Sequence, residues 1–519
     1  MVGQTNVDKK VILNGNGLTL DDFIAVTRQN AQVVLAAEAV ERMTRSRAVV
    51  EGIVAKDVTA YGITTGFGKF SNVHIQESDA NQLQNNLILS HCTGCGDPYP
   101  QEVVRGMLLL RANALCKGFS GIRFELVETL VEMLNRGVHP VVPQKGSLGA
   151  SGDLVPLAHM TLPLLGLGEA IYNGEKMPGG RAMELAGLPR FTLEAKEGLA
   201  LINGTQAMTS VGAHAFYDTL HAAQLADIIA SLTMEALFGQ LNAFEDRVQA
   251  VRPHPGQRLV AANMRALCAG SALLDFVQET CVQDAYALRC VPQVHGAIRG
   301  ALDHVLSVLS VEFNAVTDNP LVFADDNAVI SGGNFHGEPL ALALDYLGIA
   351  CAEIANISER RLERLVNHSL SKGLPAFLTP NGGLHSGFMI CQYTAASMVS
   401  ENKVLAHPAS VDSIPSSANQ EDHVSMGATA ARKAGWIAQN TLSVLGLELM
   451  AAAQALDFRM QKTRLSLSPV HERLYRRIRQ EIPFLSQDCE MRLYIPKIEA
   501  LVRSEELTGI VKQELPDFA

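Results

Sequence analysis

A run of small residues in the first third of the chain could carry out unusual chemistry. Residues 146–153 read Gly-Ser-Leu-Gly-Ala-Ser-Gly-Asp and place Ala150, Ser151 and Gly152 in a tight turn. Because glycine has no Cβ, the amide nitrogen of Gly152 can approach the Ala150 carbonyl. Ring closure and two dehydrations would convert Ser151 into an exocyclic methylene on an imidazolone, which is an electrophile made from backbone. On spacing alone, the preferred interpretation is simpler: a glycine-rich turn that caps a helix beginning near Asp153.

The elements that must hold this turn differ between the two parts of the chain. From about residue 61 to residue 206, Gly, Pro, Asn and Ser recur between short apolar segments, which indicates loops carried on a rigid frame. After residue 206 apolar residues recur at helical spacing over long distances. The sequence therefore predicts a loop-rich N-terminal region over residues 1–205 and a helical bundle with a helical C-terminal part over residues 206–519.

Local signals predict several of the individual elements. Lys10 to Leu13 is β-prone, and Thr19 is placed to cap a helix, with Asp22 three residues on. Residues 428–458 are rich in Ala and Leu and predict another long helix. One buried helical seam is predicted from residues that step by four, three, four and three: Leu340, Leu344, Leu347, Cys351 and Ile354. The predicted fold class is all-α, with a long central helical bundle.

Composition excludes several classes of function. The chain has 519 residues and a formal net charge of −11, which argues against nucleic-acid binding. No stretch approaches the roughly 18 apolar residues of a membrane span, and Met1 to Lys10 has no apolar signal core. We therefore expect a cytoplasmic protein that does not contact membranes. Its nine scattered cysteines are expected to be reduced, and no phosphate-binding glycine motif predicts a nucleotide cofactor.

The run around Ser151 resembles the signature of the aromatic amino-acid ammonia-lyases. This family includes the histidine, phenylalanine and tyrosine ammonia-lyases and related aminomutases, and the similarity extends from about Tyr61 to Gly427. The family forms a methylidene-imidazolone group (MIO) from Ala-Ser-Gly. The resemblance implies an MIO built from Ala150, Ser151 and Gly152, and a homotetramer whose active sites combine loops from different subunits.

Tyr61 opens the stretch over residues 61–68, which is similar to the family's mobile loop that bears the catalytic base. The β-hydrogen of an amino acid is far less acidic than any side chain, so the base must be held against it in a dry site. A tyrosinate could serve, but its usual pKa near ~10 requires positive charge or hydrogen-bond donors nearby to lower it. The alternative is a tyrosine that packs under a glycine-rich turn.

Two positions bear on the substrate ring. His91 stands where the family selects the ring, and an imidazole can exchange hydrogen bonds with another imidazole or with a phenol. Glu421 occupies a position that is Glu in the histidine enzymes and Gln in the phenylalanine and tyrosine enzymes. A carboxylate can hold an imidazole N–H, whereas against an apolar ring it would be buried without a partner. Without the family, His91 and Glu421 would be a structural histidine and a surface carboxylate.

The resemblance assigns further roles across the chain. Asn203 matches the residue that bonds the prosthetic group or the substrate amine, and Phe335 matches the aromatic residue packed beside that group. Gln283, Tyr286 and Arg289 are similar to the segment that supplies a second active-site tyrosine and the arginine for the substrate carboxylate, which a guanidinium binds at two points. Taken alone, these residues are an ordinary helical turn and a core phenylalanine.

Two departures weaken the choice of substrate. The histidine enzymes usually have Asn at the position of Thr64, and Pro-Tyr-Ser where this chain has residues 285–287. Both variants look more like the phenylalanine and tyrosine branch. The implied reaction is elimination of ammonia from L-histidine to give trans-urocanate, with a tyrosine or phenylalanine lyase or aminomutase as the alternative.

Two rival interpretations do not involve this chemistry. A metal or redox site could lie at residues 91–95, where His91 precedes a Cys-x-x-Cys. Tetrahedral zinc usually needs a second pair of ligands, and none follows, so we expect no metal. A catalytically inactive helical binding or assembly protein would explain the apolar seams, but it has no chemical reason to keep the complete set of Tyr61, Asn203, Arg289 and residues 150–152.

Overall fold

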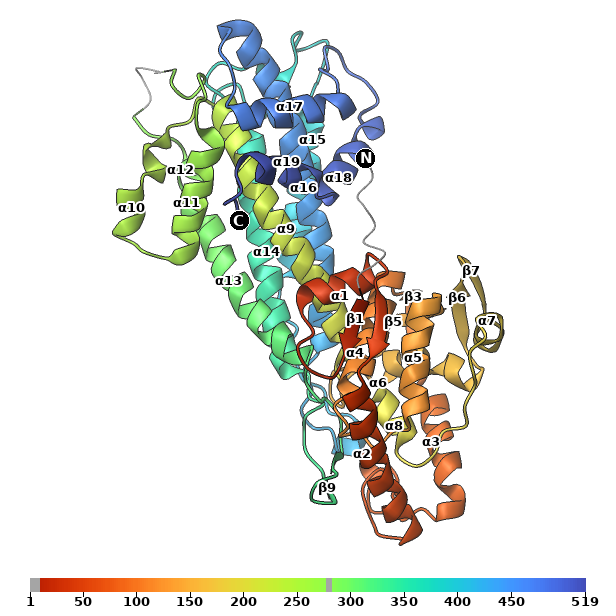
Figure 1. Cartoon of the computed structure of the whole chain (residues 1–519). Coiled ribbons are helices and arrows are strands. Elements are labelled where there is room, and N and C mark those ends of the chain that lie inside the picture. The colour runs from red at the N-terminus through yellow and green to blue at the C-terminus, as the bar shows by residue number, and fades with distance from the viewer. Residues whose placement is uncertain (1–9, 277–281) are drawn as a thin grey trace. The chain divides into compact units, whose positions relative to one another are not determined.

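The computed structural model describes residues 10–276 and 282–519. They form a mainly helical protein with a few short strands, as the sequence predicts (Figure 1). The elements of the N-terminal region, with α9, have these bounds: β1 (Lys10–Leu13), α1 (Leu20–Thr27), β2 (Gln32–Leu35), α2 (Ala37–Ala55), α3 (Glu77–His91), β3 (Cys95–Pro98), α4 (Gln101–Leu115), α5 (Phe124–Arg136), β4 (His139–Pro140), β5 (Pro143–Lys145), α6 (Leu154–Thr161), β6 (Glu169–Tyr172), β7 (Glu175–Pro178), α7 (Gly179–Leu185), α8 (Glu197–Ile202) and α9 (Gln206–Ala236).

The rest of the chain adds longer helices and one hairpin. Their bounds are α10 (Asp246–Ala250), α11 (Pro255–Cys268), α12 (Tyr286–Arg289), α13 (Val291–Glu312), β8 (Leu321–Phe323), β9 (Ala328–Ile330), α14 (Glu338–Val366), α15 (Met389–Leu405), α16 (Gly427–Thr463), α17 (Pro469–Glu481), α18 (Ile495–Arg503) and α19 (Glu506–Glu514). The predicted strand at Lys10 is β1, which pairs in parallel with β2. The predicted cap is confirmed, because the Thr19 side chain accepts from the Asp22 backbone in a capping box.

The chain folds into two compact units, each made of three stretches. The first unit contains residues 1–214, 306–345 and 408–432, and the second contains residues 215–305, 346–407 and 433–519. The division falls within α9, α13, α14 and α16. The predicted boundary between residues 205 and 206 follows composition along the chain and stays a prediction.

A buried carboxylate joins three helices in the second unit. Glu448 on α16 is fully buried and accepts two hydrogen bonds from Arg361 on α14, at 2.6 and 2.9 Å. Thr233 on α9 donates to the same carboxylate at 2.8 Å. The pairing joins two buried charges of opposite sign, and the seam predicted on α14 is likewise buried at all five positions.

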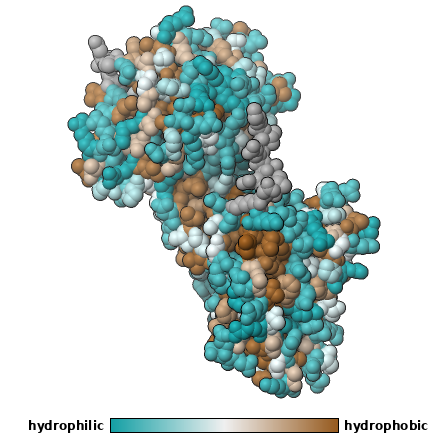
Figure 2. Space-filling model, viewed as in Figure 1, coloured by the Kyte–Doolittle hydropathy of each residue, from teal (hydrophilic) through white to brown (hydrophobic). Residues whose placement is uncertain are grey.

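Two helices are long and apolar enough to cross a membrane by length and composition, although neither contains the uninterrupted apolar run that the sequence expectation concerned. These are α14 and α16, and 72% and 89% of their most apolar windows are buried inside the protein. They are therefore core helices. Exposed apolar side chains gather instead over β1 and β2 of the first unit (Figure 2), where Ile12 is 65% and Val34 43% exposed.

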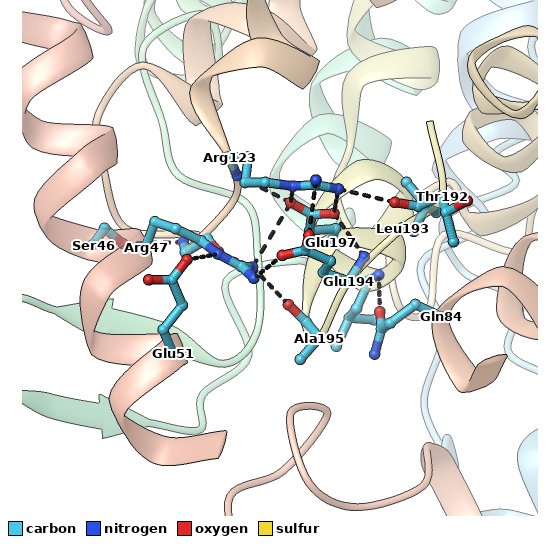
Figure 3. Close-up of polar contacts among 12 residues, drawn as sticks. Ser46, Arg47, Glu51, Gln84, Arg123, Thr192, Leu193, Glu194, Ala195 and Glu197 are labelled. Carbon is cyan, nitrogen blue, oxygen red and sulfur yellow. Dashed lines mark hydrogen bonds and ion pairs between the residues drawn. The ribbon is translucent and has the colours of Figure 1, made fainter. Parts of the chain in front are cut away.

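An ion network in the first unit anchors α8, the short helix that leads to Asn203. Arg123 holds the fully buried Glu197 through two hydrogen bonds of 2.6 Å. Arg47 and Arg123 both contact Glu194, at 2.7 and 2.9 Å (Figure 3). The Glu194 backbone N–H also donates to Glu197 at 2.7 Å. The start of α8 is thus held by charge-assisted hydrogen bonds.

We expect Glu197→Ala to lower the free energy of unfolding by about 3–5 kcal/mol, because removing one partner leaves the Arg123 guanidinium without its main acceptor. Chemical denaturation of the purified protein measures the change. The matched control is Glu169→Ala, whose partner Lys176 lies 3.0 Å away in an exposed pair and which should cost about 1 kcal/mol or less. Equal costs for the two variants would contradict the anchoring role of Glu197.

Candidate active site

The loop that carries Tyr61 is shaped by threonine hydroxyls. The Thr64 hydroxyl donates to the Val58 carbonyl at 2.7 Å and accepts from the Ala60 N–H at 2.9 Å. The Gly62 N–H donates to the Thr65 hydroxyl at 3.1 Å. Local side-chain bonds of this kind give the backbone a turn in place of a helix or strand. Thr64 is therefore occupied by its own loop, and it does not line the cavity described below.

The loop that carries Ser151 is held against the segment that carries Glu421. The Ser425 hydroxyl donates to the Gly149 carbonyl at 2.9 Å, and the Met426 N–H donates to the Leu148 carbonyl at 2.8 Å. Ala150 is buried in a small apolar cluster with Val424 and Met426. Residues almost 280 positions apart in the sequence are thus fixed side by side.

Gly152 meets the backbone that follows α8 at very short range. Its φ is +72°, a left-handed conformation that glycine tolerates best. A Cβ at this position would lie 2.3 Å from the Gly204 carbonyl oxygen. That same oxygen accepts from the Asp153 N–H at 2.6 Å. Only glycine allows this approach, so the turn is packed against the backbone at Gly204 as well as preceding α6.

The side chain of Asn203 makes two hydrogen bonds to Ser151. Its side-chain N–H₂ donates to the Ser151 carbonyl at 2.8 Å and to the Ser151 hydroxyl at 3.0 Å. Asn203 is 1% exposed, and its own carbonyl accepts from Arg111 at 2.8 Å. Its side-chain oxygen is buried without a partner among the described residues. The amide is therefore rigid and keeps one acceptor for a group that forms or binds at Ser151.

A cavity of about 700 Å³ opens beside Ser151. Its walls come only from the first unit: the Tyr61 loop, α3, the Ser151 loop, α8 and the segment before Glu421. The polar and ionisable side chains that line it are those of Tyr61, Lys69, Asn86, Ser90, His91, Ser151, Ser417 and Glu421. Four of the sequence-predicted site residues, Tyr61, His91, Ser151 and Glu421, therefore face one cavity of a size that suits a small ligand.

Burial dominates the electrostatics of this cavity. Burial raises the pKa of the Tyr61 phenol, the Gly68 N–H at 3.4 Å lowers it, and the charge of Glu421 raises it. The pKa of Tyr61 is raised on balance, whereas the proposed base needs it lowered. Burial likewise lowers the pKa of His91, which outweighs a hydrogen bond to the Leu87 carbonyl and the Glu421 charge. His91 is thus a neutral imidazole at neutral pH.

The remaining predicted residues lie outside this cavity lining. Phe335 is half-buried in the first unit, in a segment whose Gly337 N–H donates to the Gly149 carbonyl at 3.3 Å. Gln283, Tyr286 and Arg289 belong to the second unit. Tyr286 is 70% exposed, and the Arg289 guanidinium lies 4.5 Å from the centre of its ring. Within the first unit, the structure brings Tyr61, His91, Ser151 and Glu421 of the predicted set to one cavity, with Asn203 bonded to Ser151.

The Cys-x-x-Cys beside His91 lacks further metal ligands nearby in the described part of the chain. Among residues 10–276 and 282–519, no group of three or more His, Cys, Asp or Glu side chains could hold a metal ion. The Cys92 thiol donates to the Leu89 carbonyl at 3.1 Å, and Cys95 lies exposed in β3. All eight cysteines in the described part of the chain are free thiols.

Sequence reasoning missed the residues that orient the site. Arg111 supports Asn203, and Asp153 accepts from the Ser147 hydroxyl and the Met208 N–H, both at 2.8 Å. Ser90 and Ser416 contact His91 and Glu421. Asp153 follows Gly152 directly, so the sequence itself shows that Asp153 lies beside the Ser151 turn. The spacing of Arg111, Ser90 and Ser416 does not reveal their contacts.

Comparison with known proteins places the chain in a family. Residues 18–480 match the aromatic amino acid lyase family, and the chain belongs to that family. It is 56% identical over 506 residues to the histidine ammonia-lyase of Caldanaerobacter subterraneus subsp. tengcongensis, covering 98% of this chain and 99% of that one.

Solved structures agree with this placement. The histidine ammonia-lyase of Trypanosoma cruzi is 43% identical with a TM-score of 0.91, covering 98% of this chain and 96% of that one. The tyrosine aminomutase of Streptomyces globisporus is 36% identical with a TM-score of 0.93, covering 98% and 99%. The fold is therefore the one shared by lyases and aminomutases of this family.

Burial raises the pKa of Asp153 to about 6 from its usual 3.8. A carboxyl whose pKa is higher in the folded state stabilises the fold fully below its unfolded pKa and loses that contribution as pH rises through the folded pKa. Between about pH 4 and pH 6, the wild type should lose up to about 3 kcal/mol of stability relative to Asp153→Asn. Denaturation of both proteins at several pH values measures this difference, and a constant difference would contradict it.

Proposed function

We propose that this chain eliminates ammonia from L-histidine to give trans-urocanate. The proposal rests on family membership, on full-length relatives named histidine ammonia-lyase, and on one observation in the site. Ser151, held by Asn203, faces the same cavity as Tyr61, His91 and Glu421. This arrangement puts a candidate electrophile, a candidate base and two ring-binding groups around one ligand-sized space.

Family membership implies an MIO group, and we assign it to Ala150, Ser151 and Gly152. The close approach at Gly152 and the two hydrogen bonds from Asn203 to Ser151 fit a backbone compressed at this turn. When present, the group supplies an electrophile that makes the substrate amine a better leaving group. Asn203 then orients Ser151, and its free side-chain oxygen accepts an N–H at the same place.

Tyr61 is the proposed base that removes the β-proton. Its raised pKa in the single chain means that an added positive charge must stabilise the tyrosinate. Arg289, the proposed clamp for the substrate carboxylate, is a candidate source of that charge. We propose a homotetramer in which the segment with Gln283, Tyr286 and Arg289 reaches the cavity of another subunit, and the high exposure of Tyr286 supports this.

His91 and Glu421 are the proposed partners of the imidazole ring. Both line the cavity near Tyr61, and the charge of Glu421 acts on both His91 and Tyr61. Thr64, which departs from the pattern of the histidine enzymes, is buried in its own loop and leaves the ring-binding groups unchanged. Phe335 is proposed to pack beside the prosthetic group. We place the reaction in the cytoplasm.

Ser151→Ala should fold normally and lose nearly all turnover, because alanine has no hydroxyl to eliminate. Urocanate formation is followed by the growth of its ultraviolet band. The intact mass of the wild type should be two water molecules below the translated mass, and that of the variant should be one water or less below its own. Full activity in Ser151→Ala, or a wild type at full translated mass, would refute the assignment.

Glu421→Gln should damage histidine turnover more than tyrosine turnover. An amide replaces an ionised acceptor by a neutral one, and hydrogen bonds to charged groups contribute about 1.5–3 kcal/mol, which corresponds to roughly a tenfold to hundredfold loss of kcat/KM for histidine. Parallel assays with L-histidine, L-tyrosine and L-phenylalanine measure the ranking. The opposite ranking would favour a tyrosine lyase or aminomutase.

A further inference from the structure

A serine hydroxyl contacts one ring nitrogen of His91 and bears on which nitrogen carries the hydrogen. The Ser90 hydroxyl lies 3.2 Å from the Leu87 carbonyl and 3.0 Å from Nδ1 of His91. A carbonyl can only accept, so we assign the single hydroxyl proton of Ser90 to Leu87. The contact with His91 must then be donated by the ring, which places the hydrogen on Nδ1. Nε2 of the neutral ring is left as an acceptor.

A second hydroxyl aims the carboxylate of Glu421. The Ser416 hydroxyl donates to one carboxylate oxygen, Oε2, at 2.9 Å. The same two residues are also joined through their backbones, by N–H to carbonyl bonds of 2.9 and 3.3 Å. Because the backbone pair closes the turn, the Ser416 hydroxyl is not needed to hold the loop. Its contact restricts the rotamer of Glu421 and leaves Oε1 to accept from a ligand.

We propose that Ser90 and Ser416 are positioning residues that set the ring-binding end of the cavity as a pair of hydrogen-bond acceptors. The inference rests on the proposed function and extends it, since it names what orients the ring-binding groups. His91 and Glu421 both line the cavity, and Ser90 lines it too. A ring that presents an N–H finds an acceptor there. A ring without a donor leaves these half-buried acceptors unpaired, which a site built for hydrogen bonding rejects.

Binding can be separated from chemistry by working in a Ser151→Ala background, where the ligand is not consumed. Calorimetry would measure the Kd of L-histidine for this background alone and with Ser416→Ala or Ser90→Ala added. Loss of one oriented contact should weaken binding about tenfold in each case. Ser416→Thr, which keeps the hydroxyl, should restore it.

The matched control is Ser413→Ala. Ser413 lies in the same segment and accepts from the Val424 N–H at 3.0 Å, without contact to Glu421. It should bind L-histidine as tightly as the background does. A double-variant test removes the remaining ambiguity: once Glu421→Gln is present, adding Ser416→Ala should cost less than twofold, because the hydroxyl acts only through the carboxylate.

Any one of four results would overturn the inference. The first two are unchanged Kd values for Ser90→Ala and Ser416→Ala, and equal weakening by Ser413→Ala. The other two are a full tenfold loss on adding Ser416→Ala in the Glu421→Gln background, and no binding of L-histidine by the Ser151→Ala background. Turnover of L-histidine by the wild type is measured separately. Its absence with an intact binding pattern would refute the proposed function and leave the acceptor pair standing.

Discussion

The contact between two glycine backbones at Gly152 and Gly204 is the constraint around which the site is built. A side chain at Gly152 would collide with the Gly204 carbonyl, whose oxygen instead accepts from Asp153 at the start of α6. The contact brings the Ser151 turn within reach of Asn203, the residue just before Gly204. Asn203 is in turn held by Arg111 and by an α8 that begins in the Arg123 and Glu197 ion network. Rigidity at Ser151 thus comes from elements well outside the cavity.

Burial and the charge of Glu421 together set the electrostatics of the cavity around Tyr61. Burial and Glu421 both disfavour an ionised Tyr61, and the Gly68 N–H offsets only part of that effect. Charges interact more strongly in a cavity without water, so a guanidinium or a substrate ammonium there would strongly favour the ionised form of the Tyr61 phenol. Exposed Tyr286 with its stacked Arg289 carries such a charge on a segment of the second unit. In the proposed tetramer, assembly and substrate binding would add positive charge near the Tyr61 phenol.

Ring selection depends on hydrogen-bond direction as much as on charge. Ser90 and Ser416 carry no charge, but they contact His91 and Glu421 and are proposed to set the use of both groups as acceptors. Under the proposed function, the reaction is separate from the choice of ring: the Ser151 turn and Tyr61 act on the amine and the β-proton of the substrate, whereas the acceptor pair contacts the ring. Such a separation suits a fold shared by lyases and aminomutases with different aromatic substrates.

By itself, the sequence determined the helical class, the buried seam of α14, the Thr19 cap and the region of the prosthetic turn. Each of these follows from local spacing, which a linear chain displays directly. The resemblance at Tyr61, His91, Ser151 and Glu421 also pointed to residues that line one cavity. Only the tertiary structure decided that Gly152 lies against Gly204, that Asn203 holds Ser151, that Tyr286 and Arg289 belong to the other unit, and that Ser90 and Ser416 contact His91 and Glu421. These features depend on contacts between segments that are distant in the sequence, or on the rotamers of single side chains. Neither kind of feature produces a repeating pattern in the sequence.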